Sequence, residues 1–92
     1  MLIAKYSRRF KKDLKAAVKA DPSVVNELRY ILDILLSGRS LPPEYRQHKL
    51  SGEFIECLEC HLRPDLLLVY RINKNELMLF LLRLGSHSKI FG

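Results

Sequence analysis

The stretch LLLVYRI, residues 66–72, decides the fold of this chain. It is an almost uninterrupted apolar run, and a run of this length predicts a strand that is buried on both faces of a sheet. Residues 73–75, Asn-Lys-Asn, are typical of a tight turn, and residues 76–84 form a second apolar run. We therefore expect an antiparallel hairpin at the centre of the sheet.

A third strand is expected before this hairpin, within residues 54–61. Side chains alternate between the two faces of a strand, so Glu59 and His61 should point the same way. After residue 84, Gly85-Ser86-His87 should turn the chain out of the sheet.

The segment between the helical and the strand-forming parts has no periodic pattern. Residues 39–52 contain Pro42-Pro43, which indicates a connecting loop with room for one helical turn. His48 is expected within this loop.

The first half of the chain has the pattern of a short strand, Leu2–Tyr6, followed by two amphipathic helices. Ser7 is a suitable cap for the first helix, and Asp21-Pro22 should start the second, which Gly38 ends. Apolar residues recur at helical spacing in both: Phe10, Leu14, Ala17 and Val18, then Val24 or Val25, Leu28, Ile31 or Leu32, and Leu35. The pattern predicts one α+β domain over residues 1–92, with two N-terminal helices packed on an antiparallel sheet.

The positive charge of the chain is concentrated at its start. The first 20 residues hold seven of the 16 Lys and Arg side chains and one of the 10 acidic ones, so their net charge of +6 equals that of the whole chain. Arg8, Lys12, Lys15 and Lys19 share one face of the first predicted helix. This asymmetry favours a polyanionic partner, although a solvated helix face would have the same pattern.

Composition indicates a globular protein of a reducing compartment. No stretch approaches the roughly 18 to 20 uninterrupted apolar residues of a membrane span, and Met1–Phe10 lacks the apolar core of a signal peptide. We therefore expect a cytoplasmic protein with no membrane partner, in which the two cysteines stay thiols.

The segment Cys57-Leu58-Glu59-Cys60-His61 matches C-x-x-C-H, the attachment motif of c-type haem. Haem attachment normally needs export, and the predicted strand would place Cys57 and Cys60 on opposite faces. The same geometry argues against a zinc site and against a disulfide between them. We favour the interpretation that both cysteines pack as small apolar residues, with haem carriage as an alternative.

Side chains that can carry acid–base chemistry gather near predicted strand ends and loops: His48, Glu59, His61, Asp65, Arg83 and His87. Cleavage of RNA by its own 2′-hydroxyl needs a base, an acid and a cation that stabilises the phosphorane. Histidines and carboxylates can divide the first two tasks, and arginine suits the third through its bidentate geometry. This chemistry requires no metal, and we assign neither a metal nor a cofactor.

Five segments, in their order and spacing, resemble the YafQ-type mRNA interferases of the RelE superfamily. They are His48-Lys49-Leu50-Ser51-Gly52, Glu59-Cys60-His61, Pro64 to Tyr70, Arg83-Leu84-Gly85-Ser86-His87 and Ile90-Phe91-Gly92. The resemblance is strong over about the last half of the chain, whereas the first half agrees in layout and basic character. It implies a microbial-RNase-like fold and a toxin that cleaves messenger RNA in the decoding site of the ribosome.

The resemblance also implies roles for individual residues. The catalytic positions of the family match His48, His61, Asp65 and His87. Its supporting positions match Glu59 and Phe91, and its phosphate-contacting position matches Arg83. We assign the general acid to His87 and the base to His48, with His61 and Asp65 setting protonation states and positioning the phosphate. Phe91 would stack on a base, or alternatively clip the chain end to the domain.

Three positions depart from the family pattern. Phe54 and Leu58 stand where relatives often have tryptophan and a basic residue, and Glu59 is often aspartate. Leu58 removes a positive charge near the substrate, which bears on codon preference and rate.

The partners implied are messenger RNA on the ribosome and a cognate, DinJ-like antitoxin. The antitoxin would be dimeric, wrap the toxin with its C-terminal segment and bind operator DNA with its N-terminal part. Arg8, Lys12, Lys15 and Lys19 would then dock on ribosomal RNA or on an acidic antitoxin segment. The alternative is a non-catalytic basic module that blocks ribosomes or joins an antitoxin on DNA.

Overall fold

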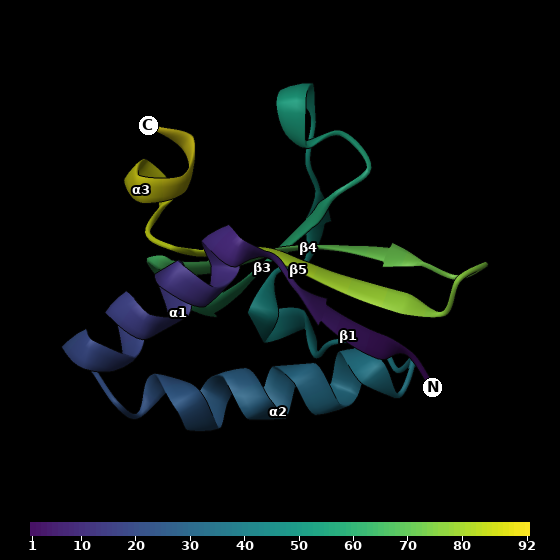
Figure 1. Ribbon diagram of the computed structural model, residues 1–92, viewed down its shortest axis with the longest axis horizontal. Coiled ribbons are helices and arrows are strands. Elements are labelled where there is room, and N and C mark those ends of the chain that lie inside the picture. The colour runs from purple at the N-terminus through teal and green to yellow at the C-terminus, as the bar shows by residue number, and fades with distance from the viewer.

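A five-stranded sheet forms around the hairpin that the sequence predicts. Its central strand β4 (Leu66–Asn73) pairs antiparallel with β5 (Met78–Gly85) on one side and with β3 (Leu58–Arg63) on the other. The edge strands are β1 (Ile3–Tyr6), next to β5, and β2 (His48–Lys49), next to β3. The computed structural model describes all residues from 1 to 92, and Figure 1 shows the sheet at its centre.

One strand pair departs from the expected antiparallel arrangement. β1 runs parallel to β5, with Ile3 opposite Met78 and Tyr6 opposite Leu81. A parallel pair needs a long crossover connection, which here contains the two long helices and the other three strands. The sheet is otherwise antiparallel, and the predicted α+β class is confirmed.

Two long helices follow β1, as predicted. They are α1 (Arg8–Ala20) and α2 (Val24–Leu36). Ser7 caps α1 as expected, because its Oγ accepts a hydrogen bond from the Phe10 amide at 2.9 Å. None of the helices has the length and apolarity needed to span a membrane.

The turn before α2 is held by a network of surface charges. The Asp21 carboxylate accepts a hydrogen bond from the Ser23 amide at 3.0 Å and another from Arg63 Nη1 at 2.7 Å. Arg63 also donates through Nε to Glu27 at 2.8 Å. Because Asp21 folds back on Ser23, the helix begins after this turn rather than at Pro22.

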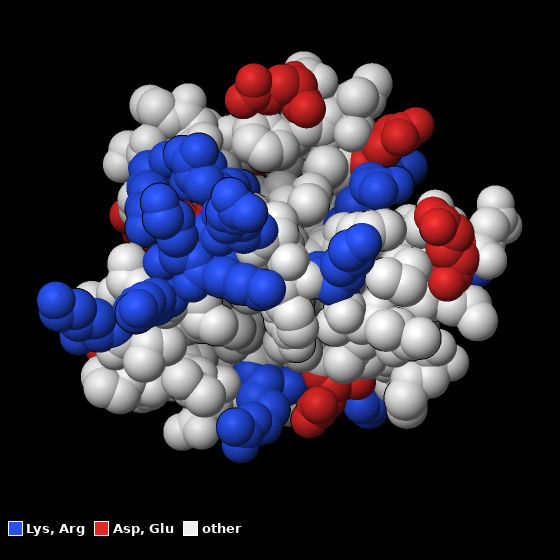
Figure 2. Space-filling model, viewed as in Figure 1, with Lys and Arg blue, Asp and Glu red and all other residues white.

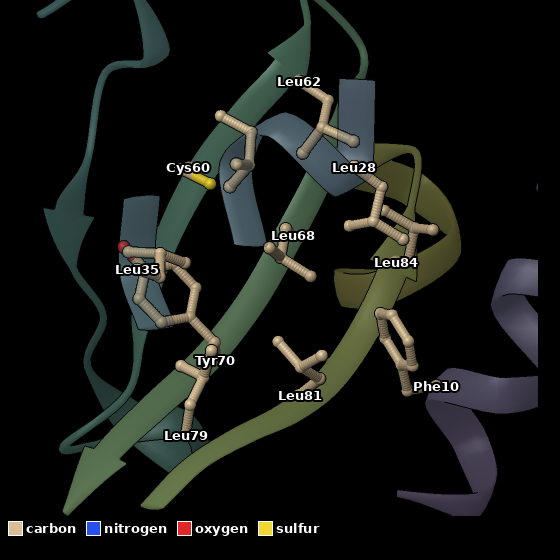
Figure 3. Packing of buried hydrophobic residues seen from close by; sticks show 11 residues of the cluster. Phe10, Leu28, Leu35, Cys60, Leu62, Leu68, Tyr70, Leu79, Leu81 and Leu84 are labelled. Carbon is tan, nitrogen blue, oxygen red and sulfur yellow. The ribbon is translucent and has the colours of Figure 1, made fainter. Parts of the chain in front are cut away.

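The main hydrophobic core lies between the sheet and α2, which runs along one face of the sheet in Figure 1. Figure 3 shows Leu28 and Leu35 of α2 beside Leu68 and Tyr70 of β4. Phe10 of α1 is fully buried and lies at the end of this core. Burial of each such side chain contributes about 1.5–3 kcal/mol to folding, so this interface orients the sheet and both helices.

The opposite face of the sheet carries a smaller cluster of buried side chains: Cys57, Leu67, Val69 and Ile90. Ile90 belongs to α3 (His87–Phe91), a short helix that sequence analysis did not predict. The same face carries Glu59 and His61, because the β3–β4 register places them opposite Val69 and Leu67.

The two cysteines lie on opposite faces of the sheet, as predicted. Cys60 belongs to the main core and Cys57 to the smaller cluster, and both are free thiols. Burial raises the pKa of the Cys60 thiol to about 12 and also raises the pKa of Cys57. Neither side chain is therefore a ready thiolate near neutral pH, and their role as core residues is confirmed.

The segment before β3 differs from the expectations. His48 lies in β2, opposite Glu59, rather than in a loop. The next residues form η2, a 3-10 turn over Gly52–Phe54, and extended backbone begins only with β3. The cause is local, because Gly52 and Glu56 have φ angles of 69° and 72°, in the left-handed region that interrupts a strand.

Candidate active site

Five of the predicted site residues meet in an open cavity on the sheet face opposite α2. Its volume of about 460 Å³ lies within the range of small-ligand sites. The wall comes from β2 and the loop after it, from β3 and from α3: His48, Leu50, Ser51, Glu59, His61, His87 and Phe91. All three histidines of the chain thus face one space.

Glu59 is the buried centre of this group. Its Oε1 atom lies 3.4 Å from His48 Nε2 and 3.3 Å from His61 Nε2. Glu59 and His61 share a face of β3, as the strand period predicts, whereas the pairing of β2 brings His48 opposite Glu59. A buried carboxylate is tolerated only where a polar group can donate to it, and His61 Nε2 can be that donor.

The orientation of His48 is set through its other ring nitrogen. Nδ1 lies 3.0 Å from the carbonyl oxygen of Arg46, which can only accept, so Nδ1 carries the proton. Arg46 has a φ of 52° and directly follows η1 (Pro43–Tyr45), the helical turn for which this loop has room. The arrangement leaves Nε2 to face Glu59.

His61 is more deeply buried than His48. Its side chain is 17% exposed, against 51% for His48. Its Nδ1 atom is buried and has no hydrogen-bond partner. A buried nitrogen without a partner costs about 1–3 kcal/mol.

His87 is the first residue of α3 and is exposed. The Asp65 carboxylate, in the turn between β3 and β4, accepts a hydrogen bond from the His87 amide at 3.1 Å. Asp65 does not line the cavity, and its contact is with the backbone that carries the imidazole. Phe91 packs against the His87 ring at 5.0 Å between centroids, and Phe54 meets Phe91 edge to face at 5.4 Å.

Arg83 lies outside the cavity wall. Its Nε donates to Asp13 Oδ2 at 2.8 Å, and its side chain is 11% exposed. Asp13 is buried on α1 and is a residue that sequence analysis did not single out. The sequence does indicate that Asp13 is buried, because it lies three residues after Phe10 and four before Ala17, on the apolar stripe of the helix.

The basic positions expected to bind RNA lie on the exposed face of α1. Figure 2 shows Lys and Arg side chains gathered over α1 and continuing towards α3. Arg8, Lys12, Lys15 and Lys19 are all exposed, and none of them forms an ion pair. They do not line the histidine cavity, so the basic face and the cavity are separate surfaces.

The cavity also offers a set of metal ligands. The donor atoms of His48, Glu59 and His61 all lie within 4.8 Å of one another. Two imidazoles and one carboxylate form a common ligand set of zinc sites that keep an open position. These residues therefore fit a divalent transition metal, which would bind the nitrogens that now face Glu59.

Comparisons with known proteins agree with this fold. Residues 2–92 match the family model of YafQ, described as the bacterial toxin of a type II toxin-antitoxin system. The mRNA interferase toxin YafQ of Escherichia coli strain K12 is 32% identical over 88 residues, which cover 95% of this chain and 92% of that protein.

Two solved structures extend the similarity over the whole fold. A metal-bound toxin from Helicobacter pylori has a TM-score of 0.92 and 46% identity, covering 99% of this chain and 100% of that chain. A chain of the DinJ-YafQ complex of Escherichia coli matches with a TM-score of 0.88 and 30% identity, and the match covers 100% of this chain and 100% of that chain. Because the family model spans nearly every residue, the chain belongs to the YafQ family of type II toxin–antitoxin toxins.

Proposed function

We propose that this chain is the toxin of a type II toxin–antitoxin pair and that it cleaves messenger RNA on the ribosome. The observation that carries the proposal is one cavity lined by three histidines and a buried glutamate, which contacts two of them. Such a set can catalyse attack by the 2′-hydroxyl through proton transfer alone. The name of the Escherichia coli relative, an mRNA interferase toxin, supports the substrate class.

His48 acts as the general base. In the neutral ring, Nδ1–H donates to the Arg46 carbonyl, so the lone pair on Nε2 is free to accept the proton of the 2′-hydroxyl. The imidazolium that forms is stabilised by the Glu59 carboxylate, 3.4 Å away. His61, whose Nε2 lies 3.3 Å from the same oxygen of Glu59, holds that carboxylate in place and positions the phosphate.

His87 acts as the general acid. It lines the same cavity as His48, and Asp65 fixes its backbone, so it can protonate the leaving 5′-oxygen. Arg83 stabilises the charge that develops on the phosphorane. Phe91 stacks on a neighbouring base, a contact worth about 1–3 kcal/mol.

The exposed basic face of α1 docks on ribosomal RNA. Arg8, Lys12, Lys15 and Lys19 have no ion-pair partner within the chain, so their charges are available to phosphates. If all four make such contacts, the logarithm of the affinity should fall with the logarithm of salt concentration at a slope of roughly −3 to −4. A variant in which all four residues are replaced by alanine should bind ribosomes with an affinity that hardly changes with salt concentration.

A DinJ-like antitoxin is the protein partner that we propose. The solved DinJ-YafQ complex contains a chain that is 30% identical to this one, which supports a similar pairing. We infer that the antitoxin is dimeric, neutralises the basic face with an acidic segment and carries the part that binds operator DNA.

The experiment compares wild type, His87→Ala and Ser88→Ala on ribosomes programmed with a defined messenger RNA. New 5′ ends are mapped by primer extension, with and without ribosomes. Wild type and Ser88→Ala, which changes an exposed neighbour, should produce codon-phased cuts only with ribosomes. His87→Ala should cut ~10²-fold or more slowly.

The alternative function is a basic module that blocks the ribosome without cutting. The unpaired basic face of α1 is the observation in its favour. Stalled translation with intact messenger RNA, equal for wild type and His87→Ala, would establish the blocking module and exclude the nuclease.

A divalent metal is a second ligand that we propose for the same cavity. The metal-bound Helicobacter pylori toxin, 46% identical, supports this capacity. His48, Glu59 and His61 would hold the ion, and a bound metal would supply a Lewis acid. It would also occupy the Nε2 lone pair that the base needs, so we expect it to inhibit cleavage.

A further inference from the structure

A second buried carboxylate, outside the histidine cavity, indicates an additional functional unit. Asp13 on α1 and Glu59 are the two buried acidic side chains of the chain. Burial of a carboxylate is unfavourable unless it is paired and hydrogen-bonded. The partners of Asp13 therefore show what its burial achieves.

Every partner of Asp13 belongs to the segment that carries His87. Oδ2 accepts hydrogen bonds from Arg83 Nε at 2.8 Å and from the Leu84 amide at 3.0 Å, and Lys89 Nζ lies 3.7 Å from Oδ1. Burial alone would raise the pKa of Asp13, but these hydrogen bonds and charges outweigh it and lower the pKa. Asp13 is thus an ionised link between α1 and the segment from β5 to α3.

A bulge in β5 decides which way Arg83 faces. Leu81 and Leu84 are three residues apart and would face opposite sides of a regular strand, yet both lie in the main core. The register with β4 shifts here, where Arg83 is opposite Val69, and Leu82 packs against the smaller cluster on the other face. The extra residue therefore turns Arg83 towards the face that carries the histidine cavity.

Arg83 also lies in line with the centre of the cavity. Val69 is opposite Arg83 on one side and opposite Glu59 on the other, so the three residues form a row across three strands. Two strand spacings separate the backbones of Arg83 and Glu59 by about 10 Å. A phosphate bound over the cavity is within the reach of a side chain as long as arginine.

The Arg83 guanidinium is held along one edge. Nε lies 2.8 Å from Asp13 Oδ2, and Nη2 lies 3.5 Å from Oδ1. A guanidinium is a planar fork with five N–H donors, so the edge away from Asp13 keeps donors in fixed directions. A cation held in this way is prepared for bidentate contact with phosphate oxygens.

We propose that Asp13 is a positioning residue for RNA cleavage, which holds Arg83 with its free edge towards the phosphate in the histidine cavity. The inference rests on the proposed function and extends it to a residue on α1. Asp13 is not a catalytic residue, because it acts through Arg83. Without its charge, the guanidinium loses the anchor that fixes its direction, and a misplacement of about 1 Å can cost ~10²-fold in rate.

The test is a double-mutant cycle of Asp13→Asn and Arg83→Ala, measured as single-turnover cleavage on programmed ribosomes. Asp13→Asn keeps the shape of the side chain and removes its charge. Its cleavage rate should fall by ~10- to 100-fold, while its affinity for ribosomes stays within about 3-fold. In the Arg83→Ala background, Asp13→Asn should cause no further loss, because its effect passes through Arg83. Asp33→Asn, an exposed acid on α2, is the control.

A purely structural role of Asp13 would give a different result. Asp13→Asn would then lower the rate by the same factor in both backgrounds, and this outcome overturns the proposal. If circular dichroism shows that Asp13→Asn is unfolded, Asp13→Glu takes its place, since it keeps the charge but moves the guanidinium. A rate of Asp13→Glu equal to wild type would also overturn the proposal. Failure of wild type itself to cut would count against the proposed function instead.

Discussion

His48 Nε2 lies 3.4 Å from Glu59 Oε1, so an imidazole that is half exposed stands beside a carboxylate that is almost entirely buried. Water screens a buried charge only weakly. The same oxygen lies 3.3 Å from His61 Nε2. One oxygen of Glu59 therefore joins His48 and His61 in a single polar cluster.

Glu59→Gln should slow cleavage by ~10²-fold, because the amide keeps the shape of the side chain but cannot stabilise the His48 imidazolium. The measurement is the single-turnover rate on programmed ribosomes, with binding to ribosomes measured separately. Glu53→Gln, at an exposed site in η2, is the matched control. Equal rates for the two variants would show that the Glu59 charge has no part in catalysis.

The assignment of base and acid predicts different responses to a better leaving group. If the 5′-oxygen at the cut site is replaced by sulfur, the departing thiolate needs no proton. His87→Ala should then regain most of the ~10²-fold loss that it shows on normal RNA, whereas His48→Ala should not. Primer extension on ribosomes carrying the modified messenger RNA measures both rates. Rescue of His48→Ala instead would exchange the two roles.

The elements that the sequence predicts well are those long enough to show a pattern. Helices α1 and α2 repeat apolar residues at helical spacing over 13 residues each, and β4 and β5 are apolar runs of 8 residues each. β2 has two residues and α3 has five, too few for any period. Their formation depends on distant partners, such as the pairing of His48 with Glu59 and the contact of Asp65 with His87.

The candidate site divides in the same way. Strand alternation places Glu59 and His61 on one face, and the sequence predicts this because the two residues are two positions apart. The bond between Asp13 and Arg83 joins residues 70 positions apart, and the bulge that turns Arg83 depends on the register between two strands. Local sequence patterns do not predict which residues form such a pair. They show only that Asp13 is an acidic residue on an apolar helix stripe.

Zinc should inhibit cleavage by binding to His48, Glu59 and His61, because the metal and the proton compete for the same nitrogen lone pairs. Isothermal titration of the purified protein measures binding, and the rate on programmed ribosomes measures inhibition. His61→Ala removes one ligand and should weaken zinc binding by at least ~10-fold. Unchanged zinc affinity in His61→Ala would place the metal elsewhere.

Stability against unfolding should fall in acid through the turn that precedes α2. Hydrogen bonds from Ser23 and Arg63 lower the pKa of Asp21 from 3.8 to about 2. A carboxyl group whose pKa is lower in the folded state stabilises the fold above its unfolded pKa, and this contribution is lost as pH falls through the folded pKa.

The difference in unfolding free energy between wild type and Asp21→Asn should therefore shrink as the pH falls from 3.8 to about 2. Urea denaturation of wild type and Asp21→Asn at a series of pH values measures this difference. A difference for Asp21→Asn that stays constant over this range would mean that Arg63 does not hold Asp21 in solution.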